Sequence, residues 1–428
     1  MKKMFMIFML AVVNLYTTPA DLKLPDFANG IYDQFGQNFI SSSMVGRGHT
    51  GISVKGNIGS AIHNPAAFHS NSLYLSMDLL LKFPTDEFNL RYYNSDNEYI
   101  INSRPLTRTD NEGGTPGLMD VHDKSYRYQN TYQSTTPFSF IGVGLPKFIN
   151  NINLGLSYNL NRSIRYEDYK RINFIKAGRG YQIVRQPSLN EYQYTLTANW
   201  TFRDFTVGAN AIMIHQSYRE YRLEGLEDNR SFSEFIYRGQ VGFLYELEKI
   251  QFGLTYKPQV KKTLFSLDYP LPTTFPNEAS FGVSYTLTEG NVLLFDADYI
   301  RYSESAAQLN DQITLKFGFE KTMKDNTNLT VGLIHKPSIF SGEYYIRNYG
   351  SLQNFSDHDA SDFNLKNIPA YGVYDKIDLL YFTMGLSANL NDPVKINLAM
   401  MHNLTKDTKI TQIMAGFEVD LSILNNRN

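Results

Sequence analysis

The chain has 428 residues, a formal net charge of −2 and a pI near 6.5, so its charge does not favour a nucleic acid as partner. It contains no cysteine, which excludes disulfide bonds, thiolate metal sites and a lipid-modified cysteine. Aromatic residues make up 14% of the chain, with 30 Tyr and 29 Phe, yet the mean hydropathy of −0.33 is too polar for a bundle of membrane helices.

Residues 1–20 have the pattern of a secretory signal peptide. Two lysines precede an apolar run from Met4 to Val13, and the small residues Thr18 and Ala20 precede the expected cleavage site. The run is about ten residues long, whereas a membrane-spanning helix needs about twenty. We therefore expect a cleaved signal rather than an anchor, and an exported mature chain.

Residues 21–70 are predicted to form an N-terminal arm followed by a plug. The arm, through Phe39, is polar and shows no periodicity, whereas Ser41 to Phe68 is rich in glycine and small polar residues. Glycine permits positive φ angles and Asn64-Pro65 favours a turn, so such a segment is compact only when something encloses it. We interpret it as a plug inside a barrel formed by residues 71–428.

From Asn71 onward, apolar and polar residues alternate in segments of about ten to fifteen residues, which is typical of a transmembrane β-barrel. We count about fourteen segments, an even number, as expected for a single-chain bacterial barrel. The fold class predicted is therefore all-β, a transmembrane antiparallel β-barrel of about 14 strands. The segments are 73–83, 137–145, 152–164, 192–202, 205–221, 235–247, 250–266, 278–287, 292–302, 312–323, 328–340, 378–390, 394–402 and 409–421.

The alternation assigns faces to two of these segments. In residues 312–320 the odd positions are apolar and should meet lipid, whereas Lys316 and Glu320 should face the lumen, because a charge at the bilayer midplane costs a few kcal/mol. The same parity sends Asp296 and Asp298 inward. Their spacing would also suit an acid pair, but lumenal charges are common in barrels, and we favour that interpretation.

The predicted connections are of two kinds. Tight turns, such as that at Phe202-Arg203-Asp204, belong on the periplasmic side, whereas residues 84–136, 165–189 and 341–376 form long connections that should face outward and carry recognition.

The chain resembles the FadL family of outer-membrane transporters for long-chain fatty acids and other hydrophobic compounds. The resemblance begins at SSSMVGRGHTG and HNPAAF, which are similar to the N-terminal hatch of that family. It continues through GFLYELEKIQFGLTYKPQV, PLPTTFPNEASFGVSYTLTEGNVLLFDADYIRYSES, GFEKTMKDNTNLTVGLIHKPS and IDLLYFTMGLSANLNDPVKINLAMMH.

The resemblance implies a hatch inside a barrel of fourteen strands and passive uptake of an apolar ligand, which leaves sideways through a kink in the third strand. The kink would fall near Asn161 to Arg165, so Ser163 and Ile164 mark a lateral-gate region. Ser163 stands where family members often have a glycine. By position, the implied hatch residues are Gly46, Arg47, Gly51, Asn64, Pro65 and Ala66.

A lumen lined by apolar and aromatic groups with a few polar ones can hold a hydrophobic solute. The carboxylate of a fatty acid would require a cation inside, and strand parity makes Lys316 and Arg238 the ligand-binding candidates. Alternatively, these two side chains belong to a lumenal ion-pair network with Glu320, Glu246 or Glu418.

The predicted function is passive uptake of long-chain fatty acids or other hydrophobic small molecules in the outer membrane of a Gram-negative-type bacterium. A general or substrate-specific porin for polar solutes is the alternative. We expect no cofactor, no metal and no nucleic acid, and a monomer whose partners are the ligand and outer-membrane lipid. An enzyme is not expected, because neither the Asp357-His358-Asp359 run nor His215 and His402 has an enforced catalytic geometry.

Overall fold

The computed structural model describes most of the predicted barrel and part of the segment before it. The expected signal peptide and the arm through residue 39 lie outside the described residues, as does the Asp357-His358-Asp359 run. The described residues are 40–84, 91–93, 119–122, 126–129, 138–146, 151–174, 179–222, 230–264, 271–304, 309–323, 327–339, 344–347, 370–373, 378–391, 393–405 and 410–421.

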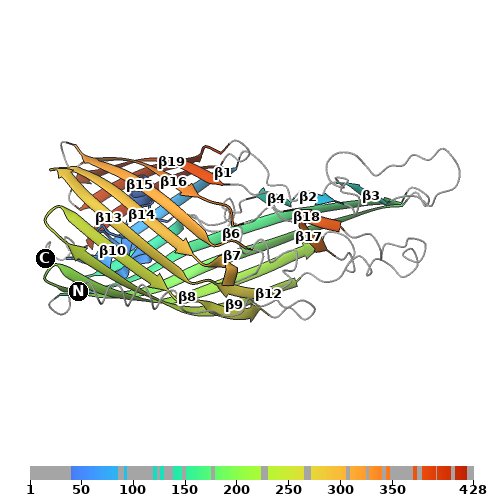
Figure 1. Cartoon of the computed structure of the whole chain (residues 1–428), viewed down its shortest axis with the longest axis horizontal. Coiled ribbons are helices and arrows are strands. Elements are labelled where there is room, and N and C mark those ends of the chain that lie inside the picture. Colours follow the sequence, from blue (N-terminus) through green and yellow to red (C-terminus); the bar gives the residue numbers. More distant parts are fainter. Residues whose placement is uncertain are drawn as a thin grey trace.

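Fourteen antiparallel strands pair side by side and close into a barrel (Figure 1). In chain order they are β1 (Tyr74–Pro84), β5 (Phe138–Leu145), β6 (Ile152–Phe174), β7 (Arg179–Phe202), β8 (Phe205–Arg222), β9 (Arg230–Glu246), β10 (Ile250–Lys257), β13 (Glu278–Thr288), β14 (Asn291–Ile300), β15 (Gln312–Thr322), β16 (Asn328–Lys336), β19 (Leu379–Asn391), β20 (Val394–Asn403) and β21 (Ile410–Asp420). Each pairs with the next, and β1 pairs with β21. Each of the fourteen strands overlaps one predicted segment, so the predicted barrel is confirmed.

Strands β6 to β9 extend beyond the other strands of the barrel (Figure 1). Strand β6 has 23 residues and β7 has 24, whereas β10 has eight. The expectation of a connecting loop over residues 165–189 was therefore wrong for most of that range. Its sequence is polar at positions of both parities, so the period-two pattern that reveals a strand with one lipid-covered face is missing there.

Shorter strands accompany this extension. Strands β3 (Met119–His122) and β4 (Tyr126–Gln129) pair with β6, and β2 (Arg91–Tyr93), β17 (Tyr344–Arg347) and β18 (Ala370–Val373) form a separate sheet. The predicted strand 250–266 is divided into β10 and β11 (Val260–Leu264), which pairs with β12 (Leu271–Phe275). The division falls at Pro258, which has no N–H to donate to a β-ladder.

The inward and outward faces follow the predicted parity. On β15, Thr314, Lys316 and Gly318 are buried, whereas Ile313 and Phe317 are exposed. On β14, Asp296 and Asp298 lie on the inner face, as expected. The exposed face of the barrel is therefore apolar and the enclosed face polar, which is the arrangement of a barrel surrounded by lipid.

Aromatic side chains gather at two levels of the outer face. Near the short turns, the ring of Trp200 stacks on Phe202 and Phe205 contacts Phe243. Farther along, the Tyr192 ring stacks on both Tyr158 and His215, and His215 stacks on Phe235. Tyr192 and Phe202 are about ten residues apart on β7, which corresponds to about 25 Å along the axis of a barrel with tilted strands.

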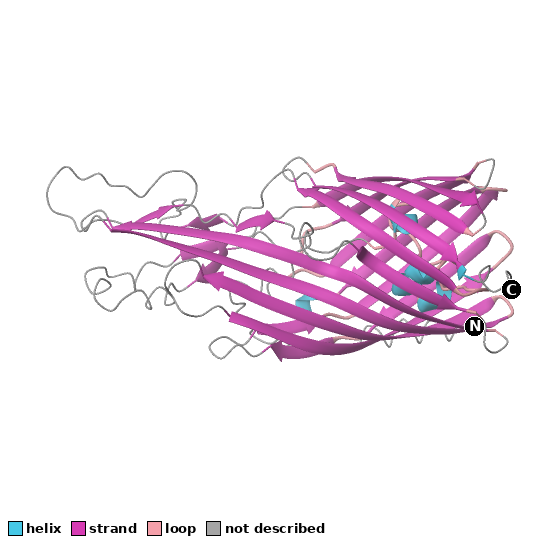
Figure 2. Cartoon of the chain, turned by 180° about the vertical axis from the view of Figure 1, so that it is seen from behind, coloured by secondary structure: helices cyan, strands magenta, loops and turns pink. Residues whose placement is uncertain are grey.

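Residues 40–70, which we call the inner segment, are enclosed by the strands (Figure 2). They form helix α3 (Ser42–Val45), helix α4 (Ile58–His63) and the 3-10 turn η1 (Pro65–Ala67). Side chains of Asn57 and Asn64 accept hydrogen bonds from Gly59 and Ala66 and so cap α4 and η1. None of the helices in the described residues is long and apolar enough to cross a membrane.

Candidate functional site

The inner segment approaches the barrel wall so closely that most strands carry a glycine where the two meet. Any Cβ added to these glycines would lie within 2.8 Å of an atom of the inner segment, well inside van der Waals contact. Several are cross-strand partners, as Gly208 with Gly242 and Gly318 with Gly332. We call them the glycine ring: Gly142, Gly155, Gly208, Gly242, Gly253, Gly282, Gly318, Gly332, Gly385 and Gly416.

Amide side chains of the wall bind backbone carbonyl groups of the inner segment. Asn199 on β7 donates to the carbonyl oxygens of Pro65 at 2.8 Å and Phe68 at 2.6 Å. On the neighbouring strands, Asn210 donates to the carbonyl of Ala61, and Gln240 to that of His63, both at 2.7 Å. Short helices leave such carbonyl groups unpaired, and here the wall supplies their donors.

On other strands, acidic and hydroxyl side chains of the wall accept hydrogen bonds from backbone amides of the inner segment. Asp78 on β1 accepts hydrogen bonds from the amide and the hydroxyl of Ser42. Thr383 on β19 accepts from the amide of Gly48 at 2.9 Å. Two ion pairs join side chains as well, Arg47 with Glu320 at 3.1 Å and Lys55 with Glu246. The segment is thus bound on several sides of the lumen.

The predicted hatch residues all lie in this contact region. Gly46 approaches the backbone of Gly385, and the amide of Gly51 donates to Asp296. The Asn64 side chain donates to the carbonyl oxygens of Ile52 and Phe243, at 2.6 and 3.1 Å. Pro65 and Ala66 are buried against Gly208. These contacts describe where the six residues are, and a hatch function for them stays a prediction.

Two histidines of the inner segment pack against each other. The rings of His49 and His63 meet edge to face with centroids 4.3 Å apart, and an imidazole nitrogen of His49 lies 3.2 Å from the carbonyl of Ile40. Burial is the main reason that the pKa values of both imidazoles lie well below the usual range. The positive charge of Lys316 lowers both further, so both side chains are neutral at pH 7.

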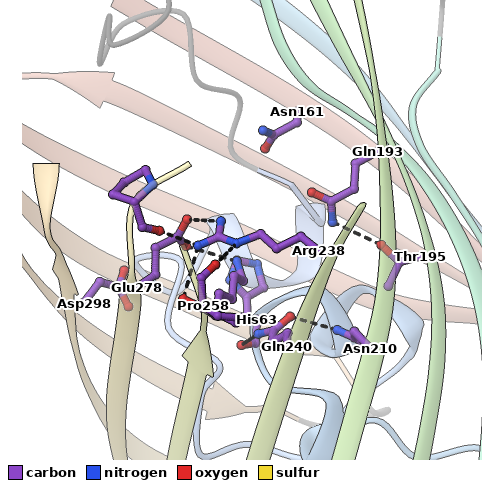
Figure 3. A network of polar contacts seen from close by, with 12 residues as sticks. His63, Asn161, Gln193, Thr195, Asn210, Arg238, Gln240, Pro258, Glu278 and Asp298 are labelled. Carbon is purple, nitrogen blue, oxygen red and sulfur yellow. Dashed lines mark hydrogen bonds and ion pairs between the residues drawn. The ribbon is translucent and has the colours of Figure 1, made fainter. Parts of the chain in front are cut away.

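Arg238, a predicted ligand-binding residue, is held by an ion pair and three carbonyl groups (Figure 3). Its guanidinium lies 2.6 Å from the carboxylate of Glu278 and donates to the carbonyl oxygens of Lys257, Pro258 and Pro276. Lys257 lies 3.2 Å from the same carboxylate. The arginine therefore joins β9 to the break between β10 and β11.

Lys316, the second predicted ligand-binding residue, is buried and pairs with Asp298 at 2.5 Å. Both cations therefore take part in ion pairs, as the alternative interpretation expected, but their partners differ from the expected ones. Lys316 pairs with Asp298, and Arg238 pairs with Glu278. Glu320, Glu246 and Glu418 pair instead with Arg47, Lys55 and Lys395. Binding of a ligand by Lys316 or Arg238 stays a prediction.

The predicted lateral-gate region lies beside an irregularity in β6. The pairing of β6 with β7 shifts register between Leu160 and Arg162, so Asn161 is a bulge. Ser163 is buried and donates a hydrogen bond to the side chain of Asn190 at 2.7 Å. Ile164 pairs through its backbone with Leu189. The kink expected near Asn161 thus coincides with a bulge, and a gate there stays a prediction.

The inner wall of β6 to β9 beyond the inner segment is part polar and part apolar. Ile212, Ile214 and Ile236 form a buried apolar cluster against which Val260 and Phe275 pack. On β6 the neighbouring inward-facing residues are Ser157 and Asn159, whose side-chain polar atoms have no hydrogen-bond partner. An apolar surface beside a few polar groups is the usual lining of a small-molecule site.

The histidines considered for catalysis lie elsewhere. His215 belongs to the outer aromatic cluster, and His402 lies 2.8 Å from the hydroxyl of Thr411. Among the described residues, no three metal-binding side chains gather in one place.

Sequence reasoning missed the wall residues that bind the inner segment, namely Asp78, Asn199, Asn210, Gln240 and Thr383. The sequence did contain a clue: these residues occupy inward-facing positions of strands that were predicted correctly. Gly318 of the glycine ring carried the same clue, since it shares the parity of Lys316 and Glu320 on β15.

Comparison with known proteins gives a fold but no sequence relative. No protein-family model and no curated protein matches the chain. Similar solved structures include a FadL homologue of Pseudomonas aeruginosa, with a TM-score of 0.62 at 12% identity over 90% of this chain and 99% of that chain. The Pseudomonas putida toluene transporter TodX has a TM-score of 0.52 at 13% identity, covering 90% and 97%. The CymD monoaromatic hydrocarbon channel has 0.50 at 10%, covering 88% and 98%. The resemblance to the FadL family is thus confirmed at the level of the fold.

Proposed function

We propose that the chain is an outer-membrane channel for the passive uptake of hydrophobic small molecules, with the inner segment as its hatch. The observation that carries the proposal is a barrel with an apolar outer face whose lumen holds a closely fitted segment of the same chain. Similarity in fold to a FadL homologue and to two hydrocarbon channels supports it. We expect a monomer with no enzymatic activity.

The outer face supports the placement in a membrane. Its two aromatic levels, represented by Tyr192 and Phe202, are separated by about the height of the apolar band of an outer-membrane barrel, about 25 Å. The extended parts of β6 to β9 would then project from the outer surface. A ligand captured there would pass along the inner wall, where Ile212, Ile214 and Ile236 offer an apolar surface.

The exit is the second element of the proposal. The inner segment is bound on several sides, so a route past it requires many contacts to break at once, whereas a lateral route requires only a local change at the wall. The bulge at Asn161 supports the region of Ser163 and Ile164 as that route, because bulges interrupt strand pairing.

The experiment compares two readouts of the full-length protein. Cells that make the protein should take up a labelled long-chain fatty acid or an aromatic hydrocarbon faster than cells without it. In planar bilayers the same protein should show little steady ion conductance, because the inner segment fills the lumen. Equal uptake with and without the protein would contradict the proposal, and a large steady conductance would support the porin alternative.

A further inference from the structure

We propose that Asn159 and Ser157 form a subsite for the head group of an uncharged amphiphile, such as an alcohol, a ketone or an amide. The inference rests on the proposed function and specifies the class of hydrophobic compound. It concerns the inner face of β6, next to the bulge at Asn161.

The first observation is that these side chains have unused hydrogen-bonding capacity. Asn159 has 0% of its surface exposed, and neither its amide oxygen nor its amide nitrogen has a partner. The hydroxyl of Ser157, two residues away on the same face, is buried and also without a partner. A buried polar group without a partner costs free energy, so such groups in a native protein call for an explanation such as a ligand or a water molecule.

The second observation is the position of these groups. Asn159 pairs in register with Gln193 on β7, and Gln193 pairs with Ile214, a member of the apolar cluster. The adjacent residue Phe140 on β5 is apolar and fully buried, and it packs in a cluster with Ile58 and Phe68 of the inner segment. Asn159 therefore has an apolar neighbour on β5, and the apolar cluster lies one strand beyond Gln193 on the other side, an arrangement that suits a molecule with one polar end.

The third observation concerns charge. Arg162, the nearest cation along β6, lies 3.7 Å from the carboxylate of Glu191, which also accepts hydrogen bonds from Asn161 and Gln216. Among the described residues, the cations that lie within 4.0 Å of a carboxylate include, on the wall, Arg162, Arg238, Lys257, Lys316 and Lys395, and, on the inner segment, Arg47 and Lys55. Lys336 on β16 is a further buried lysine of the inner face. A carboxylate ligand would have to compete with these acidic partners, whereas a neutral head group would not.

The chemistry of the subsite follows from its donors and acceptors. An amide offers two N–H donors and a carbonyl acceptor, and the serine hydroxyl can do both. A hydroxyl or carbonyl head group would satisfy them, whereas a pure hydrocarbon would leave them unpaired. A site of this kind prefers the ligand that completes its hydrogen bonds.

The test uses three probes of equal chain length: 1-octanol, octane and octanoate. Each is titrated at pH 8 against a neutral fluorescent probe, N-phenyl-1-naphthylamine, bound to the full-length protein in lipid nanodiscs, with empty nanodiscs subtracted. We expect 1-octanol to displace the probe at the lowest concentration. In Asn159→Leu, which keeps the side-chain shape, the affinity for 1-octanol should fall about threefold to tenfold while that for octane is unchanged.

Two serine variants provide matched measurements. Ser157→Ala should weaken 1-octanol binding in the same direction, whereas Ser387→Ala, a buried inward-facing serine on β19 whose hydroxyl already donates to Asn397, should not. Gel mobility with and without heating confirms that each variant is folded.

Several results would overturn the subsite. An equal loss for octane and 1-octanol would indicate a structural role for Asn159, and an unchanged preference in Asn159→Leu would assign its hydrogen bonds to water. Octanoate as the tightest ligand would indicate a charged-head site, as expected for Lys316 and Arg238. Failure of every apolar probe to bind the wild-type protein would instead contradict the proposed function, and the subsite with it.

Discussion

The backbone amide of Gly51 donates a hydrogen bond of 2.7 Å to a carboxylate oxygen of Asp296, which joins the inner segment to the middle of β14. The amide of Ile52 donates to the same oxygen at 3.1 Å. Hydrogen bonds to a charged acceptor are stronger than those between neutral groups. Asp296 was expected from the sequence only as one of two lumenal carboxylates, and its partners make it an anchor of the inner segment.

Replacement of this carboxylate should loosen the inner segment locally. In Asp296→Leu both amides lose their acceptor, and each lost bond to a charged group is worth about 1.5–3 kcal/mol. Hydrogen exchange of peptides containing Gly51 and Ile52 should therefore accelerate at least tenfold. Asp298→Asn is the control, because Asp298 pairs with Lys316. Equal protection in the two variants would contradict the anchoring role.

Deletion of Gly46 to Gly59 should convert a closed barrel into a conducting one. The deletion removes Arg47, Gly48 and Gly51, which bind Glu320, Thr383 and Asp296, so the part of the lumen they fill becomes accessible to water. Single-channel recording in planar bilayers measures the effect. A deletion variant that inserts normally yet conducts no more than the parent would show that this segment is not the plug.

The glycine ring should be intolerant of even one methyl group. A Cβ at Gly253 would lie 2.0 Å from the carbonyl oxygen of Ile52, a backbone atom that cannot rotate away. We expect Gly253→Ala to lower stability by about 1–3 kcal/mol through overpacking. The temperature at which the folded band disappears on gels measures this. Gly239→Ala is the matched control, because a Cβ there meets nothing within 4 Å. Equal midpoints would contradict a close fit.

Acidification should weaken the inner segment through His49 and His63. With the inner segment in place, the pKa values of both imidazoles lie well below the usual value of about 6.5. If the segment loosens and exposes them to water, their pKa values return toward the usual value, so the loosened state binds more protons than the closed state at a pH between the two values. Closure is therefore unaffected above pH 7 and becomes less favourable as the pH falls below about 6.5. Conductance should rise from pH 7.5 to pH 5. His49→Gln combined with His63→Gln should remove this dependence, and an unchanged pH profile in that variant would exclude these two residues.

The strands of the barrel could be predicted because apolar and polar residues alternate along them, as a strand with one lipid-covered face requires. Strands such as β15, with alternating apolar and polar residues between turn signals, were located to within a residue or two. The outer parts of β6 and β7 were missed because they extend beyond the lipid-covered band. Neither face needs to be apolar there, so the alternation of apolar and polar residues ends. The break at Pro258 was missed because the alternation continues across it, although proline cannot take part in the ladder.

The site was predictable only in part. The composition of residues 41–68 indicated that they needed enclosure, and the alternation along their strands predicted that Lys316 and Asp296 point into the lumen. Which wall group meets which backbone group could not be predicted, because the inner segment has no periodicity from which to infer a register. The partners of Arg238 depend on how Pro258 and Pro276 bring two strand ends together, which is a property of the closed barrel.

The glycine ring has a consequence for the order in which the protein is assembled. The inner segment leads directly into β1, and β1 meets β21, the last strand of the barrel to be synthesised, at the closing pair. The inner segment contacts Gly142 on one side of the lumen and Gly332 on the other, so it holds strands from different parts of the barrel at fixed positions. We therefore expect the strands to close around the inner segment, which would then act as a template for the final step of folding.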